Sequence, residues 1–545
     1  MGSQPKKQED SNMKRIISGL LVLIMCCGLL TGCGEKEPAK VEVEGGKLKV
    51  GVPQRASITD YNDNAFTKYL EENTGVDIEF VFFSSTASEY KQQLALMASS
   101  KEELPDVITG LYNLDANTVY AYGQDGYFMD LTELIEKYGD AYKKAYDNQD
   151  KKTQKLITQK ITDPDSGKIY ALPYVGMVSI DSIQSQMYIN QTWLDAVGMK
   201  APTNIDELYN VLKAFQTKDP NGNGQADEIP MLGGDAMINY VLNAFIYYEQ
   251  AHPYNVKNGE VYAPFIANEY KQALQYMNKL CKEGLYSDMS FTVTTTTELK
   301  NLYTPSNGVA QVGIICGHPQ SYTNAFSEVL DQYTPLNALG AATNEGGYMV
   351  LADQQVYLST FITKDCESPE LAMKFCDFFY EEETIIRQRR GEKDVDWKVQ
   401  PGKDFSGEEV PVYVINSQAF FEGNKTWGQM CSGILTRQNF STNMETDDQG
   451  EARALRLFSE YQVYMDNAKL KEDTVRNLTY TSQEFEIKEQ YEQTLNNYVR
   501  EQIKLFVMGT KDINSEWNNY VKQVEELGLK SVLNMKQTAY DRASK

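Results

Sequence analysis

The feature that most restricts the fold of this chain is an alternation of apolar strand-like runs and helix-like segments, which begins at Lys47. The helix-like segment between the first two runs carries its apolar side chains on one face and ends at Gly75, a residue that tolerates the left-handed conformation after a helix. The strand-like runs lie at 48–52, 76–83 and 106–110. Because a helix between two strands returns the chain so that they pair in parallel, this segment predicts an open, mostly parallel sheet.

A second α/β unit begins near residue 180. Its clearest helix follows Pro202, with Thr203 as the expected N-cap, and repeats apolar residues at helical spacing at Leu208, Val211, Leu212 and Phe215. Strand-like segments at 168–173 and 355–363 lie between the two units and are candidates for hinge crossings. We therefore predict an α/β protein with two lobes, each a mostly parallel sheet flanked by helices, with a hinge and a cleft between them.

These patterns also suggest how the 545 residues are divided. We expect the first lobe to combine residues 47–170 with 310–360, and the second lobe to combine 175–305 with 365–545. Ahead of the lobes, residues 33–46 are charged and contain Pro and Gly, which is typical of a tether.

Residues 1–32 carry the features of an export signal. Basic residues after Met13 precede an apolar run at 16–30, which is shorter than the roughly 20 residues of a membrane-spanning helix. The run ends in the sequence LTGC, which resembles a bacterial lipobox and implies cleavage before Cys33 and lipidation of its thiol with fatty acyl chains such as palmitate. The alternative is an ordinary secretory signal with free cysteines. The polar residues before Met13 are left out of the fold prediction.

Charge and composition narrow the function. The formal net charge is −24, from 52 basic and 76 acidic residues, which opposes binding to nucleic acid. His252 and His318 are the two histidines of the sequence, so catalysis that depends on histidine has few candidates. Of the eight cysteines, those after Cys33 are odd in number and show no C-x-x-C spacing. They cannot all pair with one another, and we expect most of them to be buried.

One loop carries a pattern of metal-ligating residues. Residues 219–230 (DPNGNGQADEIP) place oxygen-bearing side chains at positions 1, 3, 5 and 9 and Gly224 at position 6, as in the first half of an EF-hand loop. Position 12 is Pro230 instead of Glu, so Glu228 has to supply that ligand. The alternative is a solvated Asn-Gly turn. The predicted ligands of a structural Ca²⁺ are Asp219, Asn221, Asn223, Gln225 through its carbonyl, Asp227 and Glu228.

These segments together resemble the extracellular solute-binding proteins of ABC importers, family 1, of the sugar-binding type. The resemblance rests on 168–173 (KIYALP), on 190–194 (NQTWL) and on the ending of the loop, 227–230 (DEIP). The segments 506–509 and 539–542 near the C-terminus also match. The resemblance implies a periplasmic-binding-protein-like fold of type II, a lipoprotein outside the cell, and a structural Ca²⁺ as in the alginate-binding members.

The resemblance further implies a binding protein, expected to be a monomer, that closes over an oligosaccharide and delivers it to the transmembrane subunits of an ABC permease. In such sites, aromatic faces stack on sugar rings and carboxylates accept hydrogen bonds from hydroxyls. Residues 391–397 (GEKDVDW) correspond to a cleft-lining segment of similar proteins, although the spacing differs here. The candidate ligand residues are Trp397, Glu392, Trp427, Tyr174 and Tyr348. The alternative for the two tryptophans is a place in the core.

Two other functions stay open at this point. An extracellular glycoside hydrolase needs two carboxylates, but among 76 acidic residues some pair can always be nominated. The sequence also has no nucleophile elbow, P-loop or HExxH motif. A lipoprotein that presents its ligand to a sensor, or acts as an adhesin, would share the features above. We expect a binding protein and not an enzyme, held at the outer face of the cell membrane by lipid.

Overall fold

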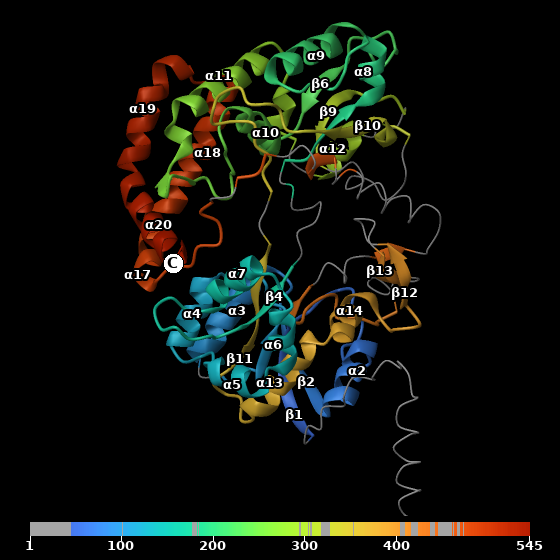
Figure 1. Cartoon of the computed structure of the whole chain (residues 1–545), viewed down its shortest axis with the longest axis vertical. Helices are drawn as coiled ribbons and strands as arrows, with labels where there is room; N and C mark the ends of the chain where they lie inside the picture. Colours follow the sequence, from blue (N-terminus) through green and yellow to red (C-terminus); the bar gives the residue numbers. More distant parts are fainter. Residues whose placement is uncertain are drawn as a thin grey trace, which may run out of the picture.

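The chain folds into two lobes, each with its own sheet and its own hydrophobic core, placed one above the other in Figure 1. This arrangement confirms the predicted two-lobed α/β fold. The structure is a computed structural model and describes residues 45–100, 102–176, 183, 185–293, 296–303, 305, 308–317, 328–351, 354–403, 409–415, 423–435, 442–444, 460, 463–465, 469–471 and 474–544.

The first lobe is built on a six-stranded sheet with the order β14-β4-β11-β3-β1-β2. Its strands run parallel except β11, which is antiparallel to both β3 and β4. The predicted strand–helix–strand opening is confirmed, and its helix ends at Gly75 with a φ of 70°. The elements of this lobe are β1 (Gly46–Pro53), α2 (Ala65–Thr74), β2 (Val76–Phe83), α3 (Ala87–Ser100), β3 (Val107–Thr109), α4 (Ala116–Gln124), α5 (Thr132–Tyr138), α6 (Asp140–Asp147), α7 (Lys151–Ile161), β4 (Leu172–Val175), β11 (Val356–Ile362), α13 (Pro369–Asp377), α14 (Glu382–Arg390) and β14 (Gly433–Ile434).

The second lobe is built on a four-stranded sheet with the order β10-β5-β9-β6. β6 and β9 are parallel, whereas β5 is antiparallel to both of its neighbours, so this sheet is mixed. The C-terminal helices complete the lobe, with α18 and α19 packed against α11 (Figure 1). The elements of this lobe are β5 (Met187–Asn190), α8 (Gln191–Val197), α9 (Ile205–Thr217), β6 (Ile229–Leu232), α10 (Asp235–Phe245), β7 (Asn255–Lys257), β8 (Glu260–Tyr262), α11 (Asn268–Lys282), α12 (Thr296–Tyr303), β9 (Val312–Cys316), β10 (Tyr333–Leu336), α17 (Ser482–Ile487), α18 (Gln493–Met508), α19 (Ile513–Glu526) and α20 (Leu529–Ser544).

A smaller sheet joins β12 (Trp397–Lys403), β13 (Glu409–Ile415) and β15 (Thr442–Met444). In Figure 1, β12 and β13 lie beside α14 on the side of the first lobe that faces the second lobe. Short 3-10 turns and one π-helical turn link several helices.

The distribution of the chain between the lobes differs from the sequence-based boundaries. The expected first lobe included 310–360, but β9 and β10 from this range pair with β5 in the second lobe. The expected second lobe included 365–545, but α13 and β14 pack in the core of the first lobe, and Ile385 of α14 clusters with Tyr174 of β4. The segments proposed as hinge crossings are β4 and β11 themselves. They pair with each other, and the crossings lie just outside them.

The start of α9 also differs from its prediction. Its N-cap is Asn204, whose side-chain oxygen accepts hydrogen bonds from the backbone N–H groups of Asp206 and Glu207. Thr203 instead donates its hydroxyl to Glu207 at 2.8 Å. Both residue types cap helices well, so the sequence alone did not distinguish between the two neighbours.

Two features of the sequence relate to the membrane. The export signal and Cys33 lie outside the described residues. Within the described residues, none of the helices is both long enough and apolar enough to cross a bilayer. The cysteines at 281, 316, 366, 376 and 431 are free, and the last three are buried, so most of them are buried as expected.

The packing of α4 gives a test of the first-lobe core. Gly123 lies in this helix, and a methyl group there would overlap the ring of buried Tyr170. Gly→Ala ordinarily stabilises a helix by about 1 kcal/mol, whereas overpacking costs about 1–3 kcal/mol. We expect Gly123→Ala to lower the melting temperature, and to raise it or leave it unchanged in a Tyr170→Ala background. Equal destabilisation in both backgrounds would contradict this packing.

Candidate functional site

The edges of the two sheets that face each other are where the chain passes between the lobes. In the first lobe, the chain leaves after β4 and returns before β11, at the edge where the parallel strands, β14 among them, end. In the second lobe, β5 begins at the edge where β9 and β10 end. Ligands of α/β proteins bind outside the carboxyl ends of the strands, so this region is the candidate site.

Three tyrosines gather at this edge of the first lobe. The ring of Tyr112, just past β3, lies 5.4 Å from the ring of Tyr174 and 5.7 Å from the ring of Tyr357, measured between centroids. The Tyr112 hydroxyl donates to the carbonyl oxygen of Gln429 at 2.8 Å. Tyr174 was a sequence candidate, whereas Tyr112, two residues past the predicted strand 106–110, and Tyr357, near the start of the predicted strand 355–363, were missed. We call these three residues the tyrosine cluster.

Two cavities flank the tyrosine cluster. A cavity of about 310 Å³ is lined by Tyr112, Tyr357 and residues at the start of α4, together with Lys160 from α7. A much smaller one, about 20 Å³, lies on the other side. Its lining consists of Tyr174, Ile385, Ile386, Gln388, Arg389, Arg390, Gln429 and Leu435. Aromatic rings beside polar side chains suit a ligand with ring faces and hydroxyl groups.

Tyr348 lies in the second lobe, next to the crossing that precedes β11. Its half-buried ring contacts Tyr247 edge-on at 5.5 Å, and the Lys469 ammonium lies 4.0 Å from its centroid. In the described part of the chain, no ring contact joins Tyr348 to the tyrosine cluster. The two sequence candidates among the tyrosines therefore belong to different lobes.

Trp427 is a core residue, which corrects its assignment to the cleft. Its side chain is 0% exposed, its ring packs edge-on against Phe66 and Phe80, and its Nε1–H donates to the Thr67 hydroxyl at 2.8 Å. The polar, Gly-flanked loop around it suggested exposure. The loop instead turns this ring inward against α2, where burial of a large apolar surface stabilises the lobe.

Glu392 lies in the turn between α14 and β12, and Trp397 is the first residue of β12. Trp397 is 2% exposed, contacts Ile386, and donates from Nε1 to the Gly391 carbonyl at 2.9 Å. Glu392 is exposed, and its backbone N–H donates to Asp396 at 2.8 Å. The carboxylate of Glu392 is therefore open to a ligand, whereas the indole of Trp397 supports the turn.

The predicted metal loop is wound around its acidic residues. Backbone N–H groups of Asn223 and Gly224 donate to the Asp219 carboxylate at 3.2 and 3.0 Å, and the amide of Asn223 donates to Asp227 at 3.1 Å. Asp219 has a φ of 44°, a conformation that turns the chain sharply. Glu228 Oε1 is buried and has no hydrogen-bond partner. Burial, and the charges of Asp219 and Asp227, raise the pKa of Glu228.

This donor set fits a hard cation. Carboxylate and amide oxygens are the ligands that Ca²⁺ prefers. The buried Oε1 of Glu228 has no hydrogen-bond donor, and a bound cation would take the place of that missing donor. Among the described residues, no three His, Cys, Asp or Glu side chains are grouped closely enough to hold a metal ion. Asp219, Asp227 and Glu228 therefore do not form such a group by themselves, and the amides of Asn221 and Asn223 and the carbonyl of Gln225 would have to complete the ligand set. The fit of this loop to Ca²⁺ therefore depends on the chemical type of its donor atoms and on the buried Glu228 oxygen that has no hydrogen-bond partner.

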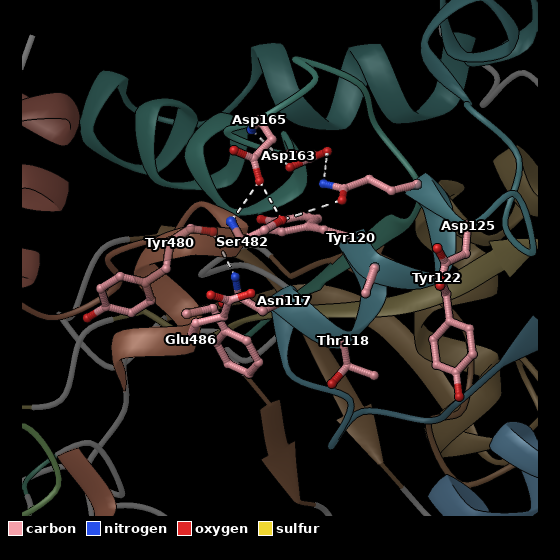
Figure 2. A pocket seen from close by; sticks show the side chains of 13 residues that line it. Asn117, Thr118, Tyr120, Tyr122, Asp125, Asp163, Asp165, Tyr480, Ser482 and Glu486 are labelled. Carbon is pink, nitrogen blue, oxygen red and sulfur yellow. Dashed lines mark hydrogen bonds between the residues drawn. The ribbon is translucent and has the colours of Figure 1, made fainter. Parts of the chain in front are cut away.

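A further pocket of about 510 Å³ lies where α4 of the first lobe meets α17 of the second (Figure 2). Asn117 donates to the Tyr480 carbonyl at 2.7 Å, and the backbone N–H of Ser482 donates to Asp165 at 2.7 Å. These bonds join the two lobes directly. This contact was not predicted from the sequence, because its partners are more than 300 residues apart in the chain.

Comparison with known proteins identifies the family. The model of the family described as bacterial extracellular solute-binding protein matches residues 55–385. The fructooligosaccharide ABC transporter substrate-binding protein FusA of Streptococcus pneumoniae serotype 4 is 26% identical over 502 residues, which cover 89% of this chain and 88% of FusA. A structure of FusA, titled as an EF-hand mutant in complex with fructo-nystose, aligns with a TM-score of 0.68 at 23% identity, over 91% of this chain and 99% of that one.

Two other solved structures share the fold. A solute-binding protein of Bifidobacterium longum infantis, described as HMO-binding, has a TM-score of 0.73 at 24% identity and covers 92% of this chain and 99% of its own. The alginate-binding protein AlgQ2, solved without calcium ion, has a TM-score of 0.62 at 22% identity, over 93% and 100% of the two chains. The family match spans more than half of the sequence, so this chain belongs to the bacterial extracellular solute-binding proteins.

Proposed function

We propose that this protein is the oligosaccharide-binding subunit of an ABC importer, and that it acts as a monomer. The observation that carries the proposal is the tyrosine cluster at the strand ends, where the chain passes between two lobes. The names of FusA and of the Bifidobacterium protein, which refer to oligosaccharides, support the same ligand class. Closure of the lobes around the ligand would exclude water from both of its faces.

The proposed contacts follow from the placement of the side chains. Half-buried Tyr357 and the neighbouring Tyr112 offer ring faces to a sugar on the first lobe. Tyr174 orients these two rings from within the cluster. When the lobes close, Tyr348 adds a ring contact to the sugar from the second lobe. The exposed carboxylate of Glu392 accepts hydroxyl hydrogen bonds, with Trp397 holding its turn in place.

The remaining parts of the proposal concern delivery. Lipidation at Cys33 would keep the protein at the outer face of the membrane, close to the permease subunits that receive the sugar. A solute-binding family also argues against the hydrolase alternative, because its members hold their ligand without converting it. A role in presenting the ligand to a sensor would use the same cleft and differs only in the partner.

We further propose a structural Ca²⁺ in the loop at 219–228. When bound, the ion would supply positive charge to three carboxylates that otherwise repel one another. The loop connects α9 to β6, whose backbone pairs with β9 at the centre of the second lobe. A cation there would hold this connection in the conformation that the fold requires.

The ligand proposal predicts binding without turnover. Tyr357→Ala removes a half-buried ring from the cluster, and we expect affinity for a bound oligosaccharide to fall about tenfold, equivalent to about 1.4 kcal/mol, in calorimetric titration. The melting temperature should change little. Tyr138→Ala, at a half-buried tyrosine of α5 outside both cavities, is the control and should keep full affinity. Release of a hydrolysed product from any bound glycan would contradict the proposal.

The calcium proposal predicts metal-dependent melting. A ligand at 100 times its Kd stabilises the folded state by about 2.7 kcal/mol, so a chelator should lower the melting temperature of the wild type. Asp219→Ala should remove this dependence. Asp195→Ala, at an exposed carboxylate of the same lobe, should retain it. If chelation leaves the wild type unchanged, the loop binds no structural cation.

A further inference from the structure

The C-terminal end of α14 presents an arginine without a counter-charge. Arg387, one turn earlier, pairs with Glu383 at 2.7 Å and lies over the ring of Tyr69. Arg390 is half-buried and lines the small cavity beside Tyr174. No ion pair or hydrogen bond of its guanidinium occurs with any residue that the structure describes. Burial, together with the neighbouring charge of Arg389, lowers the pKa of Arg390 to about 10.

The same cavity contains a second donor without an acceptor. Gln388 is 1% exposed, and its Oε1 accepts the backbone N–H of Cys431 at 2.9 Å. This bond fixes the orientation of the amide. Its Nε2 is buried and has no hydrogen-bond partner. A buried donor left in this state costs about 1–3 kcal/mol.

The positions of these donors relate them to the candidate site. Tyr174, at the end of β4, lies between this cavity and Tyr112 of the tyrosine cluster. Leu435, the residue just after β14, also lines the cavity. The two donors therefore lie at the edge of the lobe that faces the cleft.

The composition of the cavity indicates what it accepts. A water molecule could satisfy Gln388, but it would not neutralise the charge of Arg390. A carboxylate accepts hydrogen bonds only, and its planar pair of oxygens matches the fork of a guanidinium. The cavity volume of about 20 Å³ corresponds to about one oxygen atom, so one carboxylate oxygen would enter it while the other oxygen and the sugar ring stay outside on the tyrosine side.

We infer that the ligand of this site is an acidic oligosaccharide, whose sugar carboxylate is bound by Arg390 and Gln388 while its ring lies against the tyrosine cluster. This inference rests on the proposed function and adds the ligand's charge. It runs against the net charge of the chain, −24, which by itself repels acids. The guanidinium of Arg390, which lines the cavity, supplies a local positive charge where the acid group would bind.

The test compares acidic sugars with their neutral counterparts. Galacturonate and alginate oligomers, their carboxyl-reduced forms, and neutral fructo-oligosaccharides are titrated into the full-length mature protein by calorimetry. We expect an acidic oligomer to bind at least tenfold more tightly than its reduced form. Arg390→Gln and Gln388→Met should each reduce this preference, the first to within about threefold. Lys374→Gln, which removes a positive charge from α13 of the same lobe, should leave it unchanged.

Two further measurements separate a binding role from a structural one. Because Arg390 has no partner in the described structure, Arg390→Gln should leave the melting temperature of the unliganded protein unchanged or raise it. A fall of several degrees would overturn the inference, since it would assign the guanidinium to folding. Arg390→Lys keeps the charge but loses the fork, and we expect an intermediate affinity for the acidic oligomer.

The failures of the two proposals can be told apart. If a neutral oligosaccharide binds as tightly as every acidic one, the carboxylate inference is overturned and the oligosaccharide-binding function stands. If none of the sugars binds, the proposed function fails, and the inference fails with it.

Discussion

The architecture depends on one hydrogen-bonded ladder, the pairing of β11 with β3 and β4 in the first lobe. β11 reaches this place only after the chain has passed through the second lobe and returned. Because it runs antiparallel to its neighbours, it has to enter at the edge where β4 ends. This requirement brings the crossings together at one edge of the sheet, and the tyrosine cluster lies at the same edge. The position of the candidate site is thus a consequence of how the first sheet is completed.

A second set of contacts joins the lobes away from the crossings. The capping box of α17, in which Thr481 and Glu484 bond reciprocally, fixes the start of the helix that follows Tyr480. Arg542 of α20 pairs with Glu484 at 2.6 Å, and the side chain of Gln159 in α7 donates to the Ala543 carbonyl at 2.8 Å. The C-terminal helices therefore link the two lobes. Their hydrogen bonds are few and partly exposed, which suits lobes that move relative to each other.

The sequence predicted the local helices and strands well, but it predicted poorly which strands pair with each other and which side chains pack together. β1, α2 and β2 follow from apolar periodicity and from Gly75, since these signals lie within a few residues of the element they specify. The assignment of β9 and β10 to a lobe needed the identity of the paired strand, and that depends on contacts far apart in the chain. The same limit applies to Trp427, because the loop that carries it is local and the α2 surface that buries it is not.

The site shows the same division between local and distant information. The loop at 219–228 was visible in the sequence because all of its ligand candidates lie within ten residues. Arg390 was not, because an arginine at the end of a helix is ordinarily solvated and favourable there. What distinguishes Arg390 is that β4 and β14 approach it and leave it beside Tyr174 and Gln388 without an acid. The lack of a counter-charge at Arg390 appears only once the lobe is folded. It therefore carries information about the charge of the ligand that composition does not, since the excess of acidic residues alone predicts that an acidic ligand is repelled.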